Sequence, residues 1–227
     1  MNTTADIPAT PPTPVPESVP TPVPESVPTP VPESVFEPLK VAVIIGSNRE
    51  GRFGPVVADW LLGRFRGRDD LTVEVVDMAD AGLPTALSYS PSAEVSAELA
   101  KVTPKLAEAD AFVVLTPEYN HSFPASLKAL IDWHYGEWRA KPVGFVSYGG
   151  VSGGLRAVEQ LRLVFAELHA VTVRDTVSFH NAGASFDDEG RHRDPSAPDE
   201  AAKVMLDQLV WWASALRDAK AVRPYGE

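Results

Sequence analysis

The sequence predicts an α/β fold in which helices cover both faces of one parallel β-sheet. Five short apolar runs alternate along the chain with five longer segments of helical periodicity. Continuous apolar runs are typical of strands that are buried on both faces, and strict alternation with helices favours right-handed crossovers between parallel strands. Turns rich in glycine and polar residues follow the first, third and fourth runs. Such turns lie at the carboxyl ends of parallel strands, where ligands bind in sheets of this kind.

The apolar spacing assigns each element to a range of residues. The predicted strands are 40–45, 71–76, 111–115, 142–146 and 171–179, and the predicted helices are 55–65, 92–109, 124–133, 154–168 and 199–216. Pro104 predicts a break in the second helix, and segments 134–141 and 181–197 are expected to be a connector and a polar loop. Five strands fit the flavodoxin-like order 2-1-3-4-5, which gives a three-layer α/β/α sandwich.

Residues 1–38 differ in composition from the rest of the chain. They contain no lysine or arginine, and the octapeptide Pro-Thr-Pro-Val-Pro-Glu-Ser-Val occurs in them three times, from Pro12 to Val35. Proline at this density favours extended polyproline II and disfavours a packed core. We therefore expect a disordered proline-rich arm over 1–38 and one domain over 39–227. A role for the arm in spacing or docking and the absence of any role both remain open.

Composition excludes several classes of function. The net charge of −11 disfavours a nucleic-acid partner, and no apolar run approaches the ~18 residues that cross a bilayer. The absence of cysteine excludes disulfides, thiolate metal sites, iron–sulfur clusters and cysteine nucleophiles. His180, His192 and the acidic run 187–189 match no metal-ligand spacing, so no metal site is expected. The predicted location is the cytoplasm.

The first turn, 46–54, has the composition of a phosphate site. Ser47, Arg49 and Arg52 lie beside backbone amides at the expected start of a helix. A phosphate monoester carries about −1.5 to −2 charges, which guanidiniums, a hydroxyl and a helix N-terminus can hold. The turn lacks the Gly-Lys-Ser/Thr ending of a Walker A loop. An ordinary polar turn between strand and helix is the alternative reading.

The second and third turns suit a flat ring. The turn 116–121 can offer backbone amides and the side chain of Asn120 to a flavin, although a capping role is the alternative. The turn 147–154 contains four glycines, which let backbone approach a ligand closely. His121 stands beside the ring position and is a candidate for contact with nicotinamide or an acceptor, with plain exposure to solvent as the alternative.

Read together and in order, the three turns carry a family resemblance. Gly-Ser-x-Arg-x-Gly-Arg-Phe-Gly at 46–54, Pro-Glu-Tyr-Asn-His-Ser at 117–122 and Ser-x-Gly-Gly-x-x-Gly-Gly at 147–154 resemble the NAD(P)H-dependent FMN reductases, a family that includes quinone, azo-dye and chromate reductases. Many relatives have Ser and Asn where this chain has Arg52 and Gly54. The resemblance implies a homodimer or homotetramer and an FMN site formed by Ser47, Arg49, Arg52, Phe53, Pro117, Glu118, Tyr119, Asn120, Ser147, Gly149, Gly150 and Gly153.

The resulting hypothesis is an FMN-dependent oxidoreductase. NADPH or NADH would donate a hydride through FMN to a small acceptor, such as free flavin, a quinone, an azo compound or a metal oxyanion. Because the cofactor supplies the chemistry, we expect no catalytic side-chain acid or base and ping-pong kinetics in one shared cleft. A flavodoxin-type electron carrier that does not oxidise NAD(P)H is the alternative. A partner-recruiting scaffold built around the arm is a third reading.

Overall fold

Five parallel strands form one sheet in the order β2-β1-β3-β4-β5, which confirms the predicted topology. The structure is a computed structural model that describes residues 37–226. The predictions for residues 1–36 lie outside the described residues, and the proposed domain boundary is untested. The strands are β1 (Leu39–Ile45), β2 (Leu71–Asp77), β3 (Ala111–Pro117), β4 (Pro142–Tyr148) and β5 (Val171–Phe179).

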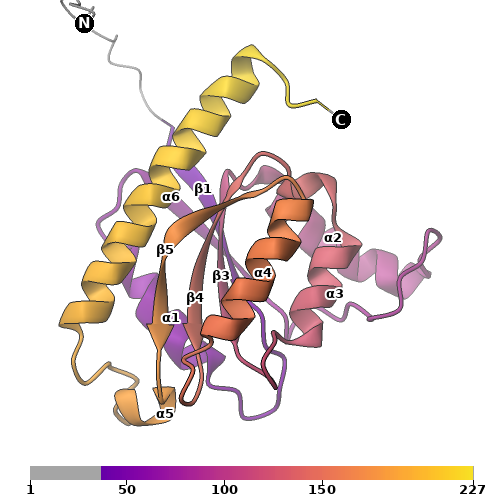
Figure 1. Ribbon diagram of the computed structural model, residues 1–227. Helices are drawn as coiled ribbons and strands as arrows, with labels where there is room; N and C mark the ends of the chain where they lie inside the picture. The colour runs from indigo at the N-terminus through magenta and orange to yellow at the C-terminus, as the bar shows by residue number, and fades with distance from the viewer. Residues whose placement is uncertain (1–36, 227) are drawn as a thin grey trace, which may run out of the picture. The chain divides into compact units, whose positions relative to one another are not determined.

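Helices pack on both faces of the sheet (Figure 1). The helices are α1 (Gly54–Arg64), α2 (Ala93–Glu108), α3 (Ala125–Trp133), α4 (Leu155–Glu167) and α6 (Ser196–Val222). Side chains of α1 and α6 share one apolar cluster with Val43 of β1, whereas those of α2, α3 and α4 share the other with its neighbours Ala42 and Ile44. Successive residues of a strand point to opposite faces of the sheet. Because helices cover both faces, the residues on either face are buried and the strand is one continuous apolar run.

The structure differs in detail from the local predictions at four places. Helix α2 runs through Pro104 without a break, because Val102 and Leu106 on either side are buried against the sheet. The predicted connector 134–141 contains a 3₁₀ turn, η1 (Gly136–Trp138), whose Trp138 is fully buried. The predicted polar loop 181–197 contains the short helix α5 (Ala182–Ser185), and α6 extends beyond both predicted ends.

Helix α6 carries exposed aromatic side chains on its outer surface. Trp211 and Trp212 are 64% and 38% exposed, and their rings meet edge to face at 5.1 Å. Its opposite side packs on the sheet through buried residues that include Leu206 and Leu209. Over residues 37–226, none of the helices combines the length and the apolar composition that crossing a bilayer requires.

Candidate functional site

The three predicted turns meet at the carboxyl end of the sheet. The Ser47 hydroxyl after β1 lies 2.6 Å from the Tyr119 hydroxyl after β3. The Glu118 amide, also after β3, donates to the carbonyl of Tyr148 at the end of β4 over 3.2 Å. Segments about 100 residues apart in sequence therefore form one surface, because neighbouring parallel strands end at the same edge.

The first turn leaves the start of α1 without a side-chain cap. Its base is held to the sheet, since the Gly46 amide donates to Leu115 over 2.8 Å and the Ser126 hydroxyl donates to the Gly46 carbonyl over 2.7 Å. Ser47 is buried, whereas Arg49 is exposed. Phe53 is the N-cap residue of α1, and its side chain accepts no hydrogen bond from the first amides of the helix. The first amides of a helix have no intrahelical partner, so this end can accept an anion.

Arg52 is engaged inside the protein. Its guanidinium donates to both carboxylate oxygens of Asp77 at the end of β2, at 2.6 Å for Oδ2, and to the Ser47 carbonyl over 2.7 Å. The two paired side chains are only 16% and 18% exposed, and the bond to Asp77 raises the pKa of Arg52. The positive charge of Arg52, which was expected to contact a phosphate, is therefore compensated by Asp77, a residue 25 positions away in sequence.

The second turn uses two amides that were expected to be free. Tyr119 and Ser122 exchange backbone hydrogen bonds of 2.8 and 3.0 Å, and Asn120 and His121 between them adopt left-handed φ values of 48° and 74°. The Tyr119 amide is thus consumed by its own turn, and the Glu118 amide by β4. Asn120 is exposed, and within residues 37–226 its amide donates to no protein acceptor. Asn120 and the neighbouring His121 amide are therefore the donors of this turn that have no acceptor among residues 37–226.

Glu118 fixes the second turn to the start of α4. Its side chain is 8% exposed. The carboxylate accepts from the Arg156 amide over 3.2 Å and pairs with the Arg156 guanidinium at 3.3 Å. An acidic group at a helix N-terminus is favourable because it satisfies a free amide and complements the helix dipole. Glu118 therefore positions the turn through its side chain, a role that the sequence did not indicate.

The third turn divides into an inner and an outer part. The Gly153 carbonyl accepts from both Ser147 and Ser178 over 2.8 Å, which places the Ser147 hydroxyl inside the turn. Gly154 has a φ of 86°, and a Cβ there would lie 2.7 Å from the Ser147 Cβ. Gly150 differs, because a Cβ there would have no described atom within 4 Å. Gly154 is thus required by the internal packing of the turn, whereas Gly150 leaves open space at its outer part.

Tyr148 is a site residue that the sequence analysis missed. It ends β4 between the three turns, and its ring centroid lies 6.2 Å from that of Phe53. Its hydroxyl is buried and bonds to no other described residue. Burial above all, then the neighbouring Tyr119, raises the pKa of Tyr148 above its usual value. The hydroxyl therefore stays protonated and is a hydrogen-bond donor without an acceptor. The signal in the sequence was an aromatic residue placed directly before Gly149.

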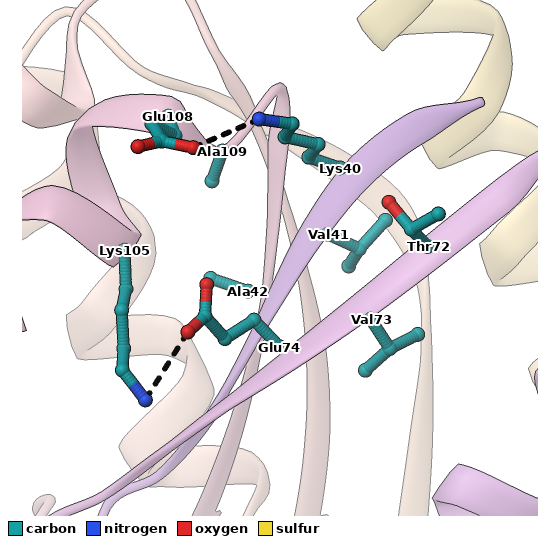
Figure 2. Close-up of a pocket in the computed structure, with 9 residues that line it drawn as sticks. All are labelled: Lys40, Val41, Ala42, Thr72, Val73, Glu74, Lys105, Glu108 and Ala109. Carbon is teal, nitrogen blue, oxygen red and sulfur yellow. Dashed lines mark hydrogen bonds and ion pairs between the residues drawn. The ribbon is translucent and has the colours of Figure 1, made fainter. Parts of the chain in front are cut away.

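A cavity elsewhere on the sheet is a weaker candidate. It has a volume of about 360 Å³ and lies between β1, β2 and α2. Figure 2 shows the two ion pairs that line it, Lys40–Glu108 at 2.8 Å and Lys105–Glu74 at 3.3 Å. Its charged groups thus neutralise one another, and no glycine-rich turn reaches it. The carboxyl end of the sheet is therefore the better site for a charged cofactor.

The chain is similar in sequence to known proteins. The sequence profile described as NADPH-dependent FMN reductase matches residues 39–184. An NAD(P)H-dependent FMN reductase of Schizosaccharomyces pombe is 38% identical over 122 residues, a match that covers 51% of this chain and 60% of that protein. An FMN-dependent NADPH-azoreductase of Staphylococcus haemolyticus is 30% identical over 181 residues, covering 76% of this chain and 94% of the azoreductase.

Solved structures show the same fold. The flavoenzyme NAD(P)H:(acceptor) oxidoreductase FerB of Paracoccus denitrificans superposes with a TM-score of 0.60 at 22% sequence identity, covering 78% of this chain and 98% of FerB. At that identity the superposition concerns the fold alone. The profile match covers most of the chain, including all three turns of the site. The chain therefore belongs to the NADPH-dependent FMN reductase family.

Proposed function

We propose that this protein is an NAD(P)H-dependent oxidoreductase that binds FMN and reduces a small acceptor. One observation carries the proposal: the turns after β1, β3 and β4 form a single surface that combines an uncapped helix N-terminus with open backbone at Gly150. The named activities of its relatives support the same reading. The acceptor class is a free flavin, a quinone, an azo compound or a metal oxyanion.

Unsatisfied groups on this surface fit FMN. The amides that begin α1 and the exposed Arg49 suit the phosphate, and Ser47, whose buried hydroxyl bonds to Tyr119, supports the same turn. Asn120 and the open backbone at Gly150 suit the edge of a flat ring. The proposed binding residues remain Ser47, Arg49, Arg52, Phe53, Pro117, Glu118, Tyr119, Asn120, Ser147, Gly149, Gly150 and Gly153. Arg52, Glu118 and Ser147 act within this set by holding the turns.

The side chains of the site orient and enclose rather than react. FMN, when bound, supplies the chemistry by accepting a hydride from NAD(P)H and passing electrons to the acceptor. The buried Glu118 and Ser147 fix the turns in place, so binding requires little rearrangement. Tyr148 stays protonated and Arg52 stays paired, and neither is poised to exchange a proton. We therefore propose no catalytic acid or base and ping-pong kinetics in which NADPH or NADH and the acceptor share one cleft.

Assembly, location and the extent of the catalytic domain are also proposed. The exposed Trp211 and Trp212 on α6 support a homodimer or homotetramer, since large apolar side chains are usually covered. A cytoplasmic location follows from the proposed donor, because cells hold NADPH and NADH inside. We propose that residues 39–227 suffice for turnover, and that the arm has no part in the chemistry.

An anaerobic spectral titration tests the function. The purified full chain is expected to show flavin absorbance that bleaches when NADPH or NADH is added and returns with a quinone. The same turnover is expected of a protein that begins at Glu37. A flavodoxin-type carrier would be yellow but would not bleach with either coenzyme. A colourless protein that takes up no FMN would contradict the proposal.

A matched pair of glycine variants tests the site. Gly150→Val adds a side chain where no described atom lies within 4 Å, so the fold is undisturbed while a ring is kept away. We expect FMN affinity to fall by about tenfold or more, which corresponds to a loss of about 1.4 kcal/mol of binding free energy. Gly63→Val in α1 adds the same side chain in open space away from the turns and should leave affinity unchanged. Equal affinity in both variants would remove Gly150 from the site.

A further inference from the structure

A second cavity lies at the amino end of the sheet. Its volume is about 560 Å³, and its charged and aromatic lining comprises Glu137 in η1, Arg139 beyond it, Lys141 before β4, and Lys220 and Tyr225 near the carboxyl terminus. Lys141 directly precedes β4, whereas Gly149 of the candidate flavin site directly follows it. A seven-residue strand is roughly 23 Å long, so the two sites are well separated.

The cavity gathers cations that have no carboxylate partner. Twelve of the twenty lysine and arginine side chains form ion pairs in the described structure, and Arg139, Lys141 and Lys220 are not among them. The protein as a whole is acidic, with a net charge of −11. Three cations without an ion pair and one carboxylate, Glu137, therefore line this cavity, which leaves it with an excess of positive charge in an acidic protein.

Lys141 is the deepest of the three. It is 7% exposed, and its ammonium donates to the carbonyls of Leu106 and Ala107 at the end of α2 over 2.8 and 2.9 Å. A cation at a helix C-terminus is favourable, but those two bonds leave its third proton without an acceptor. Burial, and then repulsion from Lys220, lowers the pKa of Lys141 to about 8. Capping explains Lys141 but not the second cation beside it.

Arg139 also has unused hydrogen-bonding capacity. Its guanidinium lies 4.6 Å from the centroid of the Tyr135 ring, and its Nε is buried with no acceptor among the described residues. Two carboxylates act on this cluster of cations without forming an ion pair with it: Glu137 accepts from the Tyr135 amide over 3.0 Å, and Asp110 accepts from the Lys40 amide over 2.9 Å and lies 3.7 Å from Arg217. The Arg139 Nε and the third Lys141 proton therefore have no acceptor among the described residues, and an anionic ligand would supply one.

We propose that this cavity binds a small phosphorylated molecule, with its phosphate between Lys141, Lys220 and Arg139. A phosphate of about −1.5 to −2 charges would accept from all three cations and relieve their mutual repulsion. The volume leaves room for a further part of the ligand over the exposed ring of Tyr225. The cavity of Figure 2 shows the contrast, because both of its lysines are paired with glutamates.

Calorimetry with inorganic pyrophosphate as the probe tests the proposal. The full chain is first loaded with FMN and the free FMN is removed by gel filtration, so that the candidate flavin site cannot hold the probe and no free phosphate ester competes for the cavity. Lys220→Gln and Arg139→Gln are each expected to weaken pyrophosphate binding by about tenfold, the loss of one charge-assisted contact. Arg66→Gln removes an exposed cation that lies outside this cavity and should have no effect. Equal weakening in all three variants would indicate non-specific charge screening and overturn the proposal.

The titration of Lys141 supplies an independent readout. NMR of labelled lysine side chains should show its midpoint near pH 8 without the probe and at least one pH unit higher with saturating pyrophosphate. Lys220→Gln should reduce the change in the Lys141 midpoint that pyrophosphate causes. Because this variant retains the buried Lys141, it is not expected to impair folding. An unmoved midpoint, or no heat of binding at millimolar pyrophosphate, would overturn the proposal. Neither result depends on whether NAD(P)H is oxidised.

Discussion

At the scale of single residues, Arg52 has protein partners that bear on its proposed contact with a phosphate. An arginine in a turn before a helix suggests direct contact with a phosphate. In the structure the guanidinium of Arg52 donates its hydrogen bonds to Asp77 and to the Ser47 carbonyl. The pair ties the first turn to the end of β2, and it leaves the exposed Arg49 as the guanidinium available to a ligand. We therefore propose that Arg52 acts by positioning the turn.

Three variants distinguish positioning from direct contact. If Arg52 positions the turn, Arg52→Gln and Asp77→Asn should both lower FMN affinity and both destabilise the fold by about 1–3 kcal/mol, between the values for exposed and buried ion pairs. Arg49→Gln should lower affinity while the unfolding free energy stays unchanged. Flavin titration and urea unfolding measure the two quantities. Tighter FMN binding in Asp77→Asn would show instead that a released Arg52 reaches the phosphate.

At the scale of elements, the sheet was predictable and the local backbone was not. Runs such as 111–115 are buried on both faces, so their sequence alone identifies the strands and their order follows from the count. The turn at 119–122 depends on left-handed backbone at Asn120, which residue type permits but does not specify. The partners of Arg52 and Glu118 come from other elements. Long-range contacts of this kind leave no local pattern in sequence.

Helix α2 offers a test of packing against local propensity. Pro104 is exposed and lacks the amide that would donate to Ala100, yet the helix continues because Leu106 is buried beyond it. Pro104→Ala should restore that bond and stabilise the fold by about 1–2 kcal/mol, after up to ~1 kcal/mol is lost to the greater freedom of the unfolded chain. Thermal unfolding measures the gain. Ser96→Ala, exposed on the same helix, should change stability by less, and a destabilised Pro104→Ala would show that the proline fits its helix without cost.

At the scale of the whole molecule, the two ends of the sheet hold groups whose protonation has opposite effects on stability. Lys141 at the amino end has a folded-state pKa of about 8, below its ordinary value of 10.5. Between these values the unfolded chain binds more protons than the folded protein, so stability rises with pH. Tyr148 at the carboxyl end has a raised pKa. Above about pH 10 the folded protein keeps the Tyr148 proton that the unfolded chain loses, so stability falls.

The unfolding free energy should therefore rise from about pH 8, by at most about 3 kcal/mol from Lys141, and turn down above about pH 10. Urea unfolding at a series of pH values measures the curve. Lys141→Met should reduce the rise, with a remainder from Lys220, whose pKa burial also lowers. Tyr148→Phe should reduce the fall, with a remainder from Lys40 and Lys203, whose pKa values their carboxylate partners raise. Each change should leave the other limb unaffected because Lys141 and Tyr148 lie at opposite ends of β4. A rise of unchanged size in Lys141→Met would assign it to another group. Saturating pyrophosphate should flatten the rise in the unmodified protein, since an anion that keeps Lys141 charged removes the difference between its folded and unfolded pKa.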